Sequence, residues 1–304
     1  MVKEGTTISD LCVFGLNHLF EKGLLKKDEI DAIIVVTISP EYFMPATSHI
    51  IHGRLGLGQN VYCSDITQGC AGYPVGLNHA FMLLEQEAIN KVVVLNADTM
   101  STKVSKKDRS SRPIIGDAAA ITIVENDQSG NIIHGAIKAD GSGAEALIIP
   151  AGGFRLPSSE ITAKLQQDKA GNSKALDHVD MKGDDVFNFV QKEVPPMIDR
   201  LLENAGLKKE DIDYFMFHQP NKFMLQQLAN QIEVEEAKVP NNVVENFGNA
   251  NSVTIPTAIT LNLGNKLTTK SYRLCLAGFG VGLSWASLIM DLGNLNFCET
   301  VDYR

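Results

Sequence analysis

A cysteine placed where a strand gives way to a helix is the residue of this chain best suited to covalent chemistry. Cys70 lies in the segment DITQGCAGYPVGLNHAFMLL, which is strand-like before the cysteine and has helical periodicity after it. At a helix N-terminus the unpaired N–H groups and the helix dipole favour the thiolate, so we expect a lowered pKa for this thiol. The small residues around Cys70 leave room for a thioester, which predicts a nucleophile that accepts an acyl group.

The other cysteines of the chain are interpreted differently. A free cysteine most often packs in the core as a small hydrophobic residue. This is the interpretation adopted for Cys12, Cys63, Cys275 and Cys298. Five cysteines make an odd number and no two of them form a CxxC pair, so we expect neither a disulfide framework nor a metal site.

Two polar residues in the second half of the chain are further candidates. His218 follows a short apolar run and is itself followed by Gln-Pro-Asn, which is an unusual sequence for a buried core. A lone histidine after a strand is often only a core residue, so this alternative stays open. Asn249 lies in Gly-Asn-Ala, and Gly-Asn is a common turn pair. Asn251, two positions later, is a rival for the same role.

An internal repeat indicates how these residues are positioned. Residues 23–36 read GLLKKDEIDAIIVV and residues 206–217 read GLKKEDIDYFMF, and each segment follows a helical pattern that stops at glycine. Cys70 lies 39 residues after Asp31, and Asn249 lies 36 residues after Asp213. The similar offsets indicate one duplicated unit with small insertions, in which Cys70 and Asn249 are equivalent.

The repeat continues beyond these residues. Strand-like segments at 91–98 and 272–280 are each followed by a second apolar segment, at 118–125 and 285–292. We therefore predict an α/β protein of two halves, residues 1–150 and 151–304, related by a pseudo-twofold axis across which Cys70 and Asn249 face each other. Residues 126–180, rich in Gly, Ser, Asp and Lys, are expected to connect the halves through surface loops.

Four motifs together resemble the ketoacyl-ACP synthase III family of thiolase-fold condensing enzymes. GCAGYPVGL resembles the family's nucleophile segment, Phe-His-Gln-Pro-Asn its His-Gln-Ala-Asn motif, Phe-Gly-Asn-Ala-Asn-Ser its Gly-Asn-Thr-Ser motif, and GFGVGLSW its glycine-rich turn. They occur in the family's order over almost the whole chain. The resemblance implies a thiolase-like fold, with two pseudo-twofold-related halves in a layered αβαβα arrangement. The first half would carry the nucleophile cysteine and the second the histidine and asparagine.

The resemblance also implies a catalytic triad of Cys70, His218 and Asn249. In the family the cysteine takes an acyl group from a coenzyme A thioester, and a malonyl thioester on acyl carrier protein then loses CO2 and attacks that group. The histidine and asparagine would stabilise the enolate oxygen, and the backbone N–H groups of Cys70 and of the 279–282 turn would form an oxyanion hole. The further substrate-binding residues that it implies are Arg109, Asn221, Phe187, Phe279, Gly280 and Val281.

A departure from the family pattern keeps other hypotheses open. The family has a further strand before the helix at 8–21, so we expect the edge of the first sheet to be open or covered by a partner chain. This favours, as one alternative, a non-catalytic truncated partner subunit. Another alternative is an acyltransferase of the same fold that moves the acyl group to an alcohol or amine. The presence of Asn249 argues against simple transfer, which needs no decarboxylation.

Composition narrows the class of protein and its partners. The net charge of −9 argues against nucleic acid as a main partner. We find neither an apolar run long enough to span a membrane nor the basic and apolar regions of a signal peptide, so we predict a cytoplasmic protein. The family resemblance adds acyl-CoA and acyl carrier protein as partners, a homodimer as the assembly, and no tightly bound cofactor.

Overall fold

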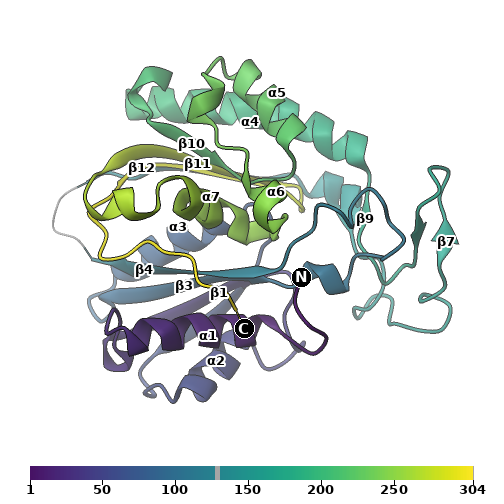
Figure 1. Cartoon of the computed structure of the whole chain (residues 1–304), viewed down its shortest axis with the longest axis horizontal. Coiled ribbons are helices and arrows are strands. Elements are labelled where there is room, and N and C mark those ends of the chain that lie inside the picture. Colours follow the sequence, from purple (N-terminus) through teal and green to yellow (C-terminus); the bar gives the residue numbers. More distant parts are fainter. Residues whose placement is uncertain (127–130, 304) are drawn as a thin grey trace.

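Two four-stranded sheets form the framework of the chain, which a computed structural model describes over residues 1–126 and 131–303 (Figure 1). In the first sheet the strand order is β2-β1-β3-β4, and β4 runs antiparallel to the three parallel strands. Its strands are β1 (Ala32–Thr37), β2 (Tyr62–Thr67), β3 (Lys91–Asp98) and β4 (Ala118–Glu125). The runs AIIVVT and KVVVLNAD are buried almost throughout, as expected of central strands covered on both faces.

The second sheet has the order β10-β11-β12-β5. Its strands are β10 (Tyr214–Phe217), β11 (Tyr272–Gly280), β12 (Ser284–Leu292) and β5 (His134–Ala139). β10 and β11 are parallel, whereas β12 is antiparallel to both of its neighbours. β5 comes from the N-terminal side of the predicted boundary at residue 150, so the chain crosses to the second sheet before that boundary.

The helices form three layers around these two sheets, as Figure 1 shows. Helices α1 (Ile8–Glu21) and α2 (Thr47–Leu55) cover the outer face of the first sheet. Helices α3 (Gly72–Leu84) and α7 (Thr254–Asn262) lie between the sheets, with the short α6 (Val243–Phe247) beside α7. Helices α4 (Gly183–Ala205) and α5 (Lys222–Gln231) cover the second sheet. The predicted αβαβα layering is confirmed.

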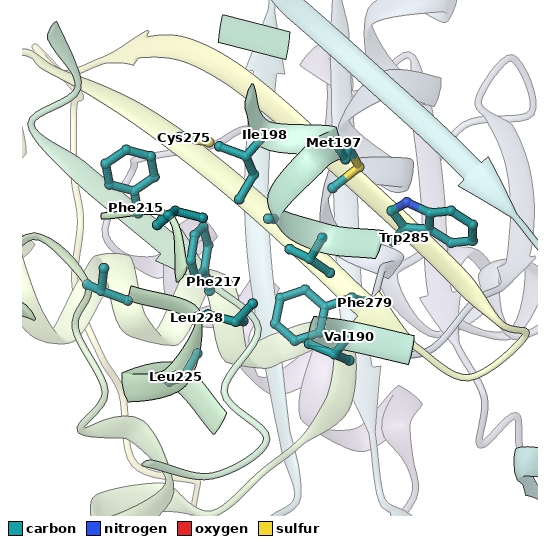
Figure 2. Close-up of a cluster of buried hydrophobic side chains, with 14 of the residues drawn as sticks. Val190, Met197, Ile198, Phe215, Phe217, Leu225, Leu228, Cys275, Phe279 and Trp285 are labelled. Carbon is teal, nitrogen blue, oxygen red and sulfur yellow. The ribbon is translucent and has the colours of Figure 1, made fainter. Parts of the chain in front are cut away.

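The largest core cluster joins α4 and α5 to the second sheet (Figure 2). The buried residues of α4 recur at intervals of three or four, which puts them on one face of the helix. Val190, Met197 and Ile198 from this face lie over Phe217 and Phe279 of the sheet. Burying one side chain of this size stabilises a fold by about 1.5–3 kcal/mol. This packing holds the ends of β10 and β11 in a fixed position.

The segment between the two halves is less regular. The sequence predicts a connection with surface loops over residues 126–180. Of these, 127–130 lie outside the described residues; the rest carry β5 and short pairings of β6 (Leu147–Ile148) with β9 (Asp180–Met181) and of β7 (Gln166–Gln167) with β8 (Ser173–Lys174). The β7–β8 hairpin extends away from the layered body, as Figure 1 shows.

Candidate active site

Cys70 lies in the tight turn between β2, which ends at Thr67, and α3, which begins at Gly72. The turn packs directly against the end of β11, where two glycines allow the backbones to meet. A Cβ atom at Gly278 would lie 2.6 Å from the carbonyl oxygen of Cys70, and one at Gly280 would lie 2.7 Å from its sulfur. No side chain fits at either position, so the glycine-rich strand end is needed to seat the cysteine.

The thiol of Cys70 is buried, with 6% of the residue exposed. This burial raises its pKa to about 11, while hydrogen bonds from the backbone N–H groups of Val281 and of Cys70 itself act in the opposite direction. The prediction of a lowered pKa is therefore wrong for the free protein, because loss of water around the sulfur outweighs the local dipoles. In the described structure both N–H groups are directed at the sulfur itself.

Replacing Gly280 by alanine is expected to reduce acylation of Cys70 by about 10²-fold, since the added methyl group must displace the sulfur from its position. The contact is 2.7 Å to the sulfur, and φ of +153° at this residue also disfavours a side chain. The rate of thioester formation measures the effect. Gly53→Ala is the control, because nothing lies within 4 Å of a Cβ atom there. Equal acylation rates in the two variants would contradict this account of Gly280.

His218 follows the last residue of β10 and is buried, with 2% exposed. Its backbone N–H bonds the carbonyl of Ala277 on β11 at 2.8 Å, which extends the ladder between the strands to the histidine. The ring lies edge-on to Phe279, with centroids 5.8 Å apart. Burial lowers the pKa of His218 to about 4, against a smaller opposing effect of the Asn251 backbone. At neutral pH the imidazole is therefore uncharged.

Thr254, the first residue of α7, sets the orientation of this ring. Its hydroxyl lies 2.8 Å from Nδ1 of His218, accepts the N–H of Gln219 at 3.2 Å and donates to the carbonyl of Asn251 at 2.9 Å. The hydroxyl has a single proton: where it turns from that carbonyl to Nδ1, the ring proton is on Nε2, which is then a hydrogen-bond donor. No sequence pattern indicated Thr254, because a threonine 36 positions after the histidine matches no local motif.

Asn249 is fixed by the backbone on one side and by its own amide on the other. Its N–H bonds the carbonyl of Ile114 at 2.6 Å, and its carbonyl accepts the N–H of Gly116 at 3.0 Å. Its Oδ1 accepts the N–H of Asn251 at 2.9 Å. The Nδ2 end of the amide therefore faces away from this bond and can donate to another group. Asn251, its rival in the sequence, adopts φ of +50° and lies beside the histidine.

The comparisons with known proteins show which family the chain belongs to. Family models described as 3-oxoacyl-[acyl-carrier-protein (ACP)] synthase III and as its C-terminal part match residues 64–141 and 202–292. A beta-ketoacyl-[acyl-carrier-protein] synthase III of Caldanaerobacter subterraneus is 32% identical over 93% of this chain and 82% of its own length. The chain belongs to the 3-oxoacyl-ACP synthase III family.

Solved structures show that the family resemblance extends to the whole fold. A crystal structure of a 3-oxoacyl-(acyl-carrier protein) synthase from Burkholderia xenovorans is 35% identical, with a TM-score of 0.91. The match covers 99% of this chain and 84% of the other. Another synthase III of the family, from Streptococcus mutans, is 30% identical over 96% of this chain and 86% of its own length.

No helix within 1–126 and 131–303 is long and apolar enough to cross a bilayer.

Three of the predicted substrate-binding residues make contacts with residues other than Cys70, His218 and Asn249. Arg109 is exposed and bonds the carbonyl of Ala170, in the turn between β7 and β8, at 3.0 Å through Nη2. Asn221 caps α5, its Oδ1 accepting the N–H of Met224 at 2.9 Å. Phe187 of α4 is half-buried and stacks on the exposed ring of Phe223, with centroids 5.8 Å apart. Their roles in binding substrate stay predictions.

Proposed function

We propose that the chain catalyses a decarboxylating Claisen condensation, in which an acyl-CoA primer and malonyl-ACP give a 3-oxoacyl-ACP. Besides the family membership, one observation carries the proposal. The sulfur of Cys70 lies against Gly280 and receives the Val281 N–H, while the neighbouring Phe279 contacts the ring of the neutral His218. A nucleophile, its oxyanion donors and an uncharged imidazole thus converge on one strand end.

The first half-reaction forms the acyl-enzyme. The Cys70 sulfur attacks the thioester carbonyl of the acyl-CoA, the new carbon–sulfur bond forms, and the bond to coenzyme A breaks. The thiol proton leaves with the coenzyme A sulfur to give the free thiol. Because the pKa of Cys70 is raised to about 11, the resting group is the thiol and must lose its proton as it attacks. The N–H groups of Cys70 and Val281 stabilise the negative charge on the attacked oxygen.

The second half-reaction forms the carbon–carbon bond. The carboxylate of malonyl-ACP leaves as CO2, and the electrons of the broken bond form an enolate. Neutral His218, through Nε2–H, and the Nδ2–H of Asn249 donate hydrogen bonds to the enolate oxygen. The enolate carbon attacks the acyl carbonyl, and the Cys70 sulfur leaves and regains one proton. The reaction thus consumes one proton and yields 3-oxoacyl-ACP, coenzyme A and CO2.

The substrates imply the remaining partners. All the groups assigned to the reaction belong to the protein, so the proposal needs no tightly bound cofactor. Both substrates bring a phosphopantetheine arm, either in coenzyme A or on acyl carrier protein. Arg109 is assigned to the coenzyme A phosphates, because a guanidinium binds phosphate oxygens with two parallel hydrogen bonds. A cytoplasmic location is proposed with this function.

A homodimer is proposed as the working assembly. β2 is an edge strand of the first sheet, and in the described chain it pairs only with β1. The loop after β1 carries three exposed apolar side chains, which are Tyr42 (61% exposed), Phe43 (73%) and Met44 (84%). An open edge beside exposed apolar side chains fits pairing with a second copy. Light scattering is expected to give twice the 33.1 kDa of the chain, and a monomer mass would overturn the proposal.

Intact-protein mass after mixing with acyl-CoAs of several lengths tests the first half-reaction. The mass is expected to increase by one acyl group, and Cys70→Ala is expected to abolish the increase. Cys275→Ala is the matched control, since Cys275 is a buried cysteine of the same strand that carries Gly280. CO2 release from malonyl-ACP by the acylated enzyme tests the second half-reaction. An acyl-enzyme that passes its group to an alcohol or amine without CO2 would contradict the condensation.

A further inference from the structure

Asp98, the last residue of β3, is a buried carboxylic acid that the proposed reaction does not use. It is fully buried, at 0% exposure. Its Oδ1 accepts the N–H of Ile38 at 2.9 Å and the hydroxyls of Thr37 and Ser39, both at 3.1 Å. Its Oδ2 lies 3.4 Å from the hydroxyl of Ser252. One side chain therefore joins the end of β3 to the end of β1 and to the segment that follows Asn249.

Such a carboxyl group is expensive to bury. A charge in the protein interior is normally paired with an opposite charge, and no ion pair of the described residues includes Asp98. Burial raises its pKa to about 7, although its hydrogen-bond donors oppose this shift. An asparagine would accept the same bonds at Oδ1 without any charge. The hydrogen bonds to three segments, rather than the charge, are therefore what this side chain contributes to the structure.

The two segments that Asp98 joins lie on two sides of the turn that carries Cys70. A Cβ atom at Gly69 would lie 3.3 Å from Cδ1 of Ile38, and one at Gly72 would lie 2.8 Å from Cβ of Ser252. The turn at 69–72 is thus in contact with both segments, and both are bonded to the same carboxyl group. Asp98 is placed to keep their separation constant.

The segment on the Ser252 side carries the groups proposed to act on the enolate. Ser252 lies in the short 3-10 helix Asn251–Val253, between Asn249 and Thr254. Other polar groups of this region are also buried, at a cost in folding free energy. The side-chain amide of Asn96, on the same face of β3 as Asp98, and Nδ2 of Asn251 are buried without a hydrogen bond in the described structure. Burial of unpaired amides is tolerated where a precise arrangement is required for function.

We propose that Asp98 is a positioning residue, which clamps the 249–254 segment against the turn of Cys70 so that Asn249 and His218 face the acyl group. The expected effect of Asp98 on the reaction rate rests on the proposed condensation. Its expected effect on the 249–254 segment rests on the hydrogen bonds alone. Asp98 touches neither substrate nor reacting atoms. The turn of Cys70 is also held by the close contacts of Gly278 and Gly280, so acylation of the cysteine does not depend on the clamp.

Separate assays of the two half-reactions test the role of Asp98. In Asp98→Ala, CO2 release from malonyl-ACP is expected to fall by about 10²-fold, whereas acylation of Cys70 stays within about threefold of the unmodified enzyme. Asp98→Asn is expected to restore CO2 release to within about threefold, because its amide oxygen keeps the bonds to 37–39 and its NH2 group reaches Ser252. Equal losses in both half-reactions, or no loss in either, would overturn the proposal.

Hydrogen exchange provides a readout that does not depend on any activity. Exchange of the amides of 249–254 is expected to accelerate in Asp98→Ala while that of 69–76 is unchanged. Asp65→Ala is the matched control: Asp65 accepts the N–H groups of Thr47 and Ser48 at the start of α2, on the outer layer. If Asp98→Ala fails to fold, Ser252→Ala replaces it with the same expectations. Unchanged exchange at 249–254 would disprove the clamp, whatever reaction the enzyme catalyses.

Discussion

Replacing His218 by alanine is expected to lower CO2 release from malonyl-ACP by about 10²–10³-fold, the typical effect of losing one preorganised donor to an oxyanion. The ring is held in place before any substrate arrives, by Thr254 at Nδ1 and by Phe279 at its edge. Because burial lowers the pKa of His218 to about 4, the ring donates its hydrogen bond as a neutral group throughout the neutral pH range. Removing it leaves the enolate oxygen with Asn249 alone.

The measurement is CO2 release by enzyme that already carries an acyl group on Cys70, which separates this step from acylation. His79→Ala is the control, because His79 lies exposed on α3 and contributes nothing to the site. Thr254→Val keeps the shape of the side chain but removes the hydroxyl that orients the ring, and is expected to cause a smaller loss of about tenfold. Unimpaired CO2 release in His218→Ala would eliminate the imidazole from the decarboxylation.

The fold was predictable because a duplication repeats the same pattern twice. The charged turn before β1 recurs before β10, and strands β3 and β11 each precede an antiparallel partner, β4 or β12. What the repeat did not predict is β5, which lies before the predicted boundary yet pairs with β12 of the second sheet. Its sequence HGAIKA is short and alternates weakly, so only its pairing in the tertiary structure identifies it as part of that sheet.

The site was predictable only in part, because some of its residues are brought together by contacts in the tertiary structure. Cys70 and His218 lie in local motifs, whereas Thr254 and Asp98 act through contacts between segments that are distant in the sequence. The sequence predicted the helix N-terminus near Cys70 correctly but gave no measure of how much water reaches the sulfur. Burial depends on the whole packing around the turn, including the β11 glycines, so the direction of the pKa shift required the structure.

Alkylation of Cys70 by iodoacetamide is expected to become about tenfold faster with each pH unit between pH 7 and pH 10, because only the thiolate reacts. Burial is the main cause of the raised pKa, to about 11, and a raised pKa means that the thiolate is lost as the pH falls below that value. The charge of Asp98 acts in the same direction as burial. The expected change over these three units is about 10³-fold.

Mass mapping of the alkylated peptides follows Cys70 separately from the half-buried Cys63 and Cys298. A rate that stopped rising by pH 8 would show that the dipole of α3 outweighs burial, contrary to the structure. Asp98→Asn provides a second check with a definite sign: it removes a nearby negative charge, so above about pH 7, where Asp98 is ionised, the variant should react faster than the unmodified enzyme. At neutral pH the resting group is thus almost entirely the thiol, because the N–H groups of Cys70 and Val281 offset only part of the effect of burial.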